Sequence, residues 1–352
     1  MSSTLERIAE EGADAFYTGS LAESMISAIQ AANGTMTLAD LQDYKVISRE
    51  VLSTTYRGHT LNTAGIPSSG SVAVGILKTM EQYPLEDSSD VNLTVHRFSE
   101  AMRFAYGARL ELGDPAFVPG AVEVEEGLMS QARARQTRKK ILDNQTQPVD
   151  VYDPRGLYTS EGHGTSHFSA VDSDGMAVSM TSTVNLLFGA HLMDPVTGVI
   201  FNNEMNDFSI PGVPNQFGFE PSAANFIRPG KRPLSSITPF IITSPSSIVA
   251  VGAAGGSRII SSTTQAIWHL IEHGMSLAQA ITVPRLHDQL MPNHTTFEDG
   301  FNRGVVESME GKGHEVVWVP PGKSAVQGVR DSSGVFEAVG EPRQKSSGGS
   351  TG

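Results

Sequence analysis

The chain has 352 residues, of which 39% are hydrophobic and 18% are charged, so it is long enough for one large or two ordinary globular domains and too apolar for a disordered chain. Its formal net charge of -13 argues against a broad surface for nucleic acid or for an anionic membrane. The absence of cysteine excludes disulfides, thiolate catalysis and cysteine-based metal sites.

The first 147 residues predict mostly helices. Apolar residues recur at helical spacing near 5–9, and further helices are expected over 21–32, from Thr37 onward, from about 68 to the stop at Pro84, and near 91–112 and 127–142. One strand is expected at 50–56. Asn33-Gly34 is a signal for the end of a helix, and Thr37 with Asp40 forms the pattern of a capping box. The basic residues between 133 and 140 indicate a solvated helix face.

The pattern changes after a turn-rich linker at 148–164. Alternating residues predict strands at 165–171 and 176–184, joined by a tight turn at Asp172–Gly175. Further strands are expected near 198–201, 240–243 and 247–252, then helices at 258–273 and 277–283, and finally a strand, a helix and a small meander within 296–339. Helices, then strands, then helices favour an antiparallel two-sheet core covered by helices.

The predicted hairpin brings hydroxyl and amide groups to one end. Depending on which two residues form the centre of the turn, Thr165 lies opposite Ser182 or Val184, so Thr183 is within one residue of facing it. Thr183 and Asn185 share one face of the second strand. Cross-strand threonine pairs that stabilise a sheet would give the same pattern.

The position of Thr165 after the linker suggests a second interpretation. A threonine hydroxyl is a weak nucleophile at neutral pH, and an N-terminal threonine can use its own α-amine as the base. Gly162-His163-Gly164 is a flexible segment that could fold back, so that the Thr165 hydroxyl attacks the Gly164 carbonyl. The cut would leave chains 1–164 and 165–352. A metal site formed by His163 and His167 is not expected, because the two histidines do not share a helix face.

Several segments together resemble one family, the γ-glutamyltranspeptidases. The segment from Thr165 resembles the start of the small subunit of that family, and the other matching segments follow in the family order. They are 165–172, 182–189, 201–208, 232–239 and 252–257, with 11–17 resembling part of the large subunit. The resemblance covers about residues 4–340.

This resemblance implies an α+β fold, the four-layer αββα sandwich of the Ntn-hydrolases, with antiparallel sheets. Residues 1–164 would be the C-terminal part of the large subunit and 165–352 the small, catalytic subunit, intertwined in one structural domain. The implied reaction is transfer or hydrolysis of the γ-glutamyl group of glutathione and related amides through a γ-glutamyl ester of Thr165, with no metal and no cofactor.

The resemblance also assigns roles to individual side chains. Thr165 is the nucleophile, Thr183 hydrogen-bonds its hydroxyl, and the N–H groups of Gly255 and Gly256 form the oxyanion hole. The substrate α-amino group would be held by Asn185, Glu204 and Asp207, and its α-carboxylate by Ser235 and Ser236.

The match departs from the family before residue 1 and at Leu187. The family's large subunit is longer at its N-terminus, so we expect this chain to lack a targeting or anchor segment and the arginine that binds the α-carboxylate. Leu187 stands where several relatives have a tyrosine. The alternative hypotheses are therefore an inactive truncated homologue and a related Ntn amide acylase.

The implied partners are γ-glutamyl compounds, amino-acid or dipeptide acceptors, and the two cleavage products for each other, but not nucleic acid. The resemblance implies a secretory, extracellular or vacuolar location for the full-length family member. Four Asn-x-Ser/Thr sequons point the same way; they lie at Asn33, Asn92, Asn144 and Asn293.

Overall fold

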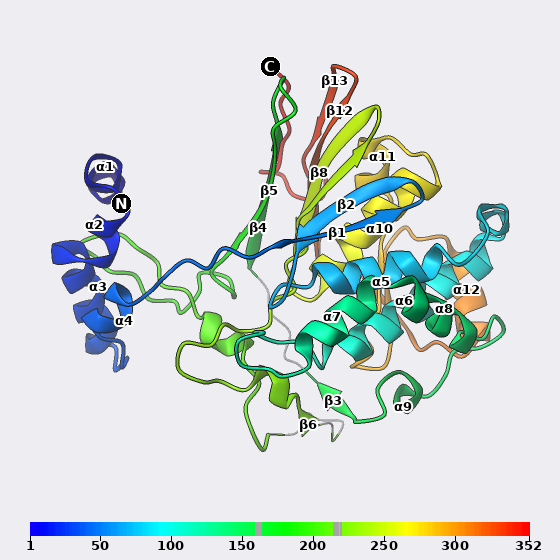
Figure 1. The fold of residues 1–352 in the computed structure, drawn as a ribbon, viewed down its shortest axis with the longest axis horizontal. Helices are drawn as coiled ribbons and strands as arrows, with labels where there is room; N and C mark the ends of the chain where they lie inside the picture. Colours follow the sequence, from blue (N-terminus) through cyan, green and yellow to red (C-terminus); the bar gives the residue numbers. More distant parts are fainter. Residues whose placement is uncertain (159–163, 214–217, 219) are drawn as a thin grey trace. The chain divides into compact units, whose positions relative to one another are not determined.

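The structure is a computed structural model of residues 1–352 that describes all of them except 159–163, 214–217 and 219 (Figure 1). The chain forms two compact units. The smaller unit contains Met1–Arg49 and Thr183–Glu204, and the larger contains Glu50–Ser182 and Met205–Gly352. Each unit therefore includes residues from both sides of Thr165.

The smaller unit consists of short helices and an irregular segment. Its helices are α1 (Ser2–Glu11), α2 (Asp14–Tyr17), α3 (Gly19–Ala31) and α4 (Leu38–Gln42). The predicted capping box of Thr37 and Asp40 is confirmed, and Asn33 has the left-handed φ of 65° expected at the end of α3. The Ser24 hydroxyl donates to Asp194 Oδ1 (3.1 Å), which ties the helices to the later segment.

The larger unit is built around a six-stranded sheet in which every neighbouring pair is antiparallel. In spatial order its strands are β1 (Val51–Tyr56), β2 (His59–Ala64), β7 (Phe240–Ser244), β8 (Ser247–Ala254), β12 (Ala325–Ser332) and β13 (Val335–Val339). A smaller sheet contains β11 (Val316–Val319), β10 (Thr295–Glu298) and β9 (Leu286–His287). Two further pairs are β3 (Leu157–Tyr158) with β6 (Glu220–Pro221), and β4 (Thr165–Val171) with β5 (Ala177–Thr183).

Helices of the larger unit gather beside the sheet (Figure 1). They are α5 (Gly70–Met80), α6 (Val91–Arg109), α7 (Ala121–Met129), α8 (Gln131–Lys140), α9 (Val149–Tyr152), α10 (Arg258–Glu272), α11 (Leu277–Thr282) and α12 (Arg303–Gly311), with short 3-10 helices η1 (Leu85–Ser89), η2 (Glu204–Asp207, across the boundary of the units) and η3 (Ala223–Asn225). All residues of α5 are buried, and it contacts α6, α7, α8 and α10. No helix in the described part of the chain is both long and apolar enough to cross a membrane.

Strand β8 separates two layers. Val249, Val251 and Ala253 belong to the hydrophobic core shared with the helices. Gly252 points to the opposite face, because side chains alternate along a strand, and there it meets the imidazole of His167 on β4. The β4–β5 hairpin therefore lies on the face of the sheet opposite the helical core.

Gly252 is required for this contact. A Cβ at Gly252 would lie 2.3 Å from His167 Cε1, so we expect Gly252→Ala to lower the free energy of unfolding by about 1–3 kcal/mol through overpacking. Denaturant unfolding measures the change. Gly311→Ala is the matched control, because a Cβ at Gly311 has no neighbour within 4 Å; an equal loss in both variants would contradict this reading.

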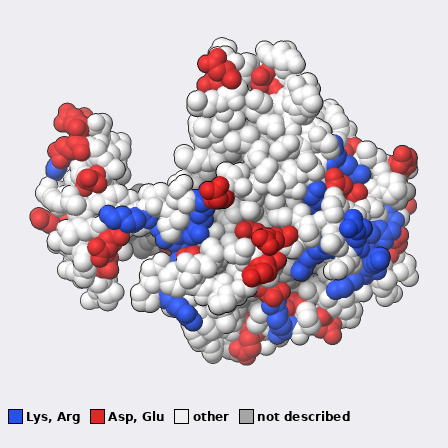
Figure 2. Space-filling view, in the orientation of Figure 1, with Lys and Arg blue, Asp and Glu red and all other residues white. Residues whose placement is uncertain are grey.

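Three predicted elements differ from the structure. The single helix expected at 127–142 is wrong: α7 and α8 are separate helices, because Ser130 begins α8 by accepting a hydrogen bond from Arg133 N. Figure 2 shows the Lys and Arg side chains of α8 gathered at the surface. The strand expected at 198–201 is one isolated bridge, Met193 to Ile200. The predicted small meander is also wrong, since β11 pairs parallel with β10 while β12 and β13 extend the large sheet.

The hairpin turn differs by one residue from both two-residue alternatives. Asp172 N donates to Met176 O (3.0 Å), and Gly175 N donates to Asp172 O (3.1 Å), so three residues form the loop. Gly175 has φ 83°, which suits the bulge position of such a turn. The Asp172 carboxylate also accepts from Asp174 N and Met176 N.

Candidate active site

Helix α6 holds a buried arginine behind the predicted serine pair. Arg109 Nη2 donates to Ser236 Oγ (3.0 Å), and its Nε donates to Ser69 Oγ (3.1 Å). Ser69 Oγ in turn donates to the Ser235 carbonyl (2.6 Å). Arg109 is buried, whereas Ser235 and Ser236 are partly exposed. The cation therefore contacts the hydroxyl of partly exposed Ser236 directly and the carbonyl of Ser235 through Ser69.

The charge of Arg109 is maintained by neighbouring groups. Burial lowers the pKa of Arg109, and the Tyr106 hydroxyl and the Asp207 carboxylate act in the opposite direction. An arginine stays protonated at neutral pH because its ordinary pKa is so high. The arginine donates to Ser236 Oγ and so occupies a lone pair of that oxygen, which leaves the hydroxyl hydrogen to point elsewhere. Such a hydroxyl is arranged to donate to an anion.

The same face of α6 also positions the glycine loop. Tyr106, three residues before Arg109, donates from its hydroxyl to the Ser257 carbonyl (2.6 Å). Gly255 has φ 130°, and a Cβ there would come within 2.8 Å of the backbone of 323–324, so only glycine fits. Tyr106, Arg109 and Ser257 line one small cavity.

Two peptide groups of this loop point away from α10. The carbonyls of Gly255 and Gly256 accept from Arg258 N (3.2 Å) and Ile259 N (3.0 Å), inside the first turn of the helix. In a trans peptide the N–H points opposite to the carbonyl, so the N–H groups of Gly256 and Ser257 point outward from the helix N-terminus. Outward N–H groups at this positive end suit a developing negative charge. The predicted pair was Gly255 and Gly256; this geometry concerns Gly256 and Ser257, and the role of the Gly255 N–H stays a prediction.

Thr165 is the first residue of β4 and is partly exposed. Gly164 before it has φ 119°, a conformation that strains any residue with a Cβ. Gly162 and His163 of the predicted cleavage segment lie outside the described residues. His167 Nδ1 contacts Thr181 Oγ1 (2.9 Å) and its Nε2 contacts Ser169 Oγ (3.0 Å), so both ring nitrogens are used within the hairpin.

His167 gives the hairpin a pH dependence. Burial lowers the pKa of His167 from 6.5 to about 4. Between these two pH values the imidazole is mostly protonated in the unfolded chain and mostly neutral in the folded chain. Stability contributed by the neutral imidazole is present above pH 6.5 and is lost as the pH falls from 6.5 toward 4. Between pH 7 and pH 5 we expect this histidine alone to lower the free energy of unfolding by roughly 2 kcal/mol. Urea unfolding of wild type and His167→Gln at both pH values measures the difference. An equal change in the free energy of unfolding between pH 7 and pH 5 in the two proteins would contradict the prediction.

The smaller unit brings together three predicted site residues. Thr183 Oγ1 accepts from Asn185 N (2.8 Å), and Asn185 Nδ2 donates to the Asn203 carbonyl (3.0 Å), next to Glu204. Asn185 is buried and has φ 70°, a backbone conformation that asparagine tolerates better than most residues. In the larger unit Asp207 acts on the charge of Arg109, the residue that contacts Ser236.

Arg109, Tyr106 and Ser257 were not predicted. The family motifs that supplied predicted site residues all lie at or after Thr165. Arg109 lies before Thr165 and in none of the matching segments. A weaker signal was present: Arg97, Arg103 and Arg109 recur every six residues along a helix with many apolar residues, and all three are buried. A buried arginine requires acceptors from other elements, so this pattern indicates a polar site beside α6.

Comparison with known proteins decides the family. The sequence profile described as Gamma-glutamyltranspeptidase matches residues 1–350. The chain belongs to the gamma-glutamyltranspeptidase family. It is 48% identical over 349 residues to the glutathione hydrolase proenzyme of Arthroderma benhamiae, covering 98% of this chain and 60% of that protein. It is 42% identical to the glutathione hydrolase of Aspergillus flavus, covering 99% of this chain and 60% of that protein.

The chain thus spans about 60% of the length of these gamma-glutamyltranspeptidase relatives. Among solved structures, the cephalosporin acylase from Bacillus halodurans matches with a TM-score of 0.79 and 22% identity, covering 97% of this chain and 60% of that one. At that identity the likeness shows the fold alone. Together with the helices and the antiparallel six-stranded sheet, it confirms the predicted α+β fold class, whereas the parallel pairs β10–β11 and β3–β6 differ from the antiparallel sheets that were predicted.

Proposed function

We propose that this chain carries the catalytic part of an enzyme that hydrolyses or transfers the γ-glutamyl group of glutathione and related amides. The observation that carries the proposal is the buried Arg109 beneath the partly exposed serine pair. A γ-glutamyl group is distinguished from other acyl groups by its α-carboxylate and α-ammonium. A cation behind the Ser236 hydroxyl suits the first, and the resemblance to the family assigns the second to the carboxylates of Glu204 and Asp207.

The chemical steps follow from the N-terminal threonine. The Thr165 hydroxyl attacks the Gly164 carbonyl, and as the peptide C–N bond breaks the α-amine of Thr165 is freed and Gly164 becomes an ester on the Thr165 oxygen. Water hydrolyses this ester, which leaves the Gly164 carboxylate and restores the Thr165 hydroxyl, and the freed α-amine acts as the base for the second reaction. That hydroxyl then attacks the γ-carbonyl of the substrate to form an ester and release the amine. The outward N–H groups at the start of α10 would stabilise the oxyanion in this step. Water or an amino-acid or dipeptide amine completes the cycle.

The division of the chain into units supports a lasting association of the two products. Each unit contains residues from 1–164 and from 165–352. After a cut before Thr165, both units would therefore still contain residues of both products. We propose that the products remain together because both contribute residues to each of the two units. The exposed sequon asparagines at positions 33, 92, 144 and 293 are compatible with a secretory location, which stays a prediction.

The test is direct. The expressed chain is separated under denaturing conditions, the N-termini are sequenced, and release of p-nitroaniline from γ-glutamyl-p-nitroanilide is followed. We expect a new N-terminus at Thr165 and turnover that increases with an acceptor dipeptide. Cleavage without turnover would favour the inactive homologue, and turnover of glutaryl but not γ-glutamyl anilide would favour an amide acylase.

A further inference from the structure

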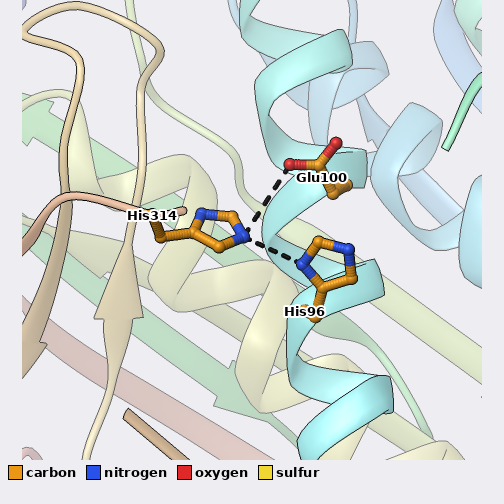
Figure 3. A group of neighbouring side chains, drawn as sticks. All are labelled: His96, Glu100 and His314. Carbon is orange, nitrogen blue, oxygen red and sulfur yellow. Dashed lines mark hydrogen bonds and ion pairs between the residues drawn. The ribbon is translucent and has the colours of Figure 1, made fainter. Parts of the chain in front are cut away.

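Three side chains of metal-binding type meet in the interior of the larger unit. His96 and Glu100 lie one turn apart on α6, and His314 precedes β11 (Figure 3). His96 Nδ1 is 2.8 Å from His314 Nε2, which is 3.9 Å from Glu100 Oε1. All three residues are buried, and Glu100 is about two and a half helical turns before Arg109. The cluster is therefore separate from the candidate active site.

The outer partners of the two imidazoles fix where their hydrogens lie. His96 Nε2 is 2.7 Å from the Leu142 carbonyl, which only accepts, so Nε2 carries the hydrogen and Nδ1 has a lone pair. His314 Nδ1 faces Thr295 Oγ1 (3.4 Å), and that hydroxyl gives its hydrogen to Asp288 Oδ2 (2.8 Å), the stronger acceptor. The threonine oxygen thus presents a lone pair to Nδ1, which carries the hydrogen.

It follows that the lone pairs of His96 Nδ1 and His314 Nε2 face each other. A cation between the two nitrogens would satisfy both lone pairs, whereas without an ion His314 Nε2 can carry the hydrogen and donate to His96 Nδ1 over the same 2.8 Å. Divalent metal ions bind such lone pairs of neutral imidazole.

The carboxylate of Glu100 completes the set of donors. Its Oε1 accepts from Thr146 Oγ1 (2.7 Å) and its Oε2 from the Tyr152 hydroxyl (2.6 Å), so its orientation is fixed. Each of the three ligands then has an outer hydrogen-bond partner, as in protein metal sites, where such partners orient the ligands.

We propose that His96 Nδ1, His314 Nε2 and Glu100 Oε1 bind a divalent first-row transition metal ion. Two nitrogens and one carboxylate oxygen suit Zn²⁺ best. With Zn–N distances near 2.0 Å the two nitrogens would stand about 3.3 Å apart, so the imidazoles separate by about half an ångström on binding. This site was not expected from the sequence.

The ion would act as a structural link. His96 and His314 are 218 positions apart, and Leu142 and Thr146 come from a third segment. A metal at this point joins α6 to the chain entering β11 and stabilises the larger unit. It has no part in the proposed γ-glutamyl chemistry, so its test does not depend on turnover.

Elemental analysis of the purified chain after equilibration with Zn²⁺ tests the proposal, and we expect about one ion per chain. Removing the ion with a chelator should lower the melting temperature, and Zn²⁺ should restore it. Replacement by Co²⁺ should give visible absorption bands from nitrogen and oxygen ligands. Both measurements use the wild-type chain and need no variant to fold.

Variants then identify the ligands. We expect His314→Gln to weaken Zn²⁺ binding at least 100-fold, and Thr295→Val, which removes an outer partner, to weaken it about 10–100-fold. His287→Gln is the matched control, because it removes a buried histidine outside the cluster. The proposal fails if the equilibrated wild type holds no metal and gives no Co²⁺ bands, or if His287→Gln loses the ion as fully as His314→Gln.

Discussion

Replacing Thr165 by alanine is expected to leave one uncut chain without γ-glutamyl turnover. The alanine variant has neither the hydroxyl that attacks Gly164 nor the nucleophile that attacks the substrate, so both reactions stop together. Turnover of γ-glutamyl-p-nitroanilide should fall by at least about 1,000-fold, the order of loss when a covalent nucleophile is removed. Electrophoresis under denaturing conditions and the anilide assay measure the two losses on the same sample.

Two further variants separate this role from a structural one. Thr165→Ser keeps a hydroxyl and should retain slow cleavage and part of the turnover. Ser166→Ala changes the exposed neighbour on the opposite face of β4 and should be cut and active like wild type. Cleavage of the alanine variant at the same bond, or loss of activity in Ser166→Ala, would refute the assignment of the nucleophile.

Local patterns predicted the parts of the fold that local interactions determine. The β4 and β5 strands follow from alternation, and the end of α3 and the capping box at Thr37 follow from single side chains. The turn was misjudged by one residue because Gly175 takes a bulge position that two-residue turns lack. The break before α8 depends on one hydrogen bond to Ser130, which the helix-favouring residues on both sides of Ser130 conceal.

The parts of the site that depend on tertiary contacts could not be predicted in this way. Ser235 and Ser236 were found through a family motif, but the arginine beneath them lies 127 positions before Ser236. His96 and Glu100 have a visible spacing of four, yet His314 joins them only through the fold. Sequence spacing identifies ligands on one helix and gives no information on those that another element supplies.

The role of Arg109 leads to the second large effect. We expect Arg109→Met to lower kcat/KM for γ-glutamyl-p-nitroanilide about 100-fold, because hydrogen bonds to charged groups contribute roughly 1.5–3 kcal/mol and the Ser236 hydroxyl loses its orientation. The loss should be small for 4-aminobutyryl-p-nitroanilide, which lacks the α-carboxylate. Steady-state kinetics with the two anilides measures this change in preference.

The comparison of the two anilides distinguishes recognition from general damage. A buried arginine also stabilises its surroundings, so melting temperatures are measured alongside, and Arg109→Lys keeps the charge without the second donor to Ser69. That variant should recover part of the preference for the γ-glutamyl substrate, whereas Ser236→Ala should lose it without removing the buried cation. Arg155→Met, at an exposed arginine, is the control. Equal losses on both anilides would mean that Arg109 supports the fold and leaves carboxylate recognition to other groups, since an effect on the α-carboxylate must disappear with that carboxylate.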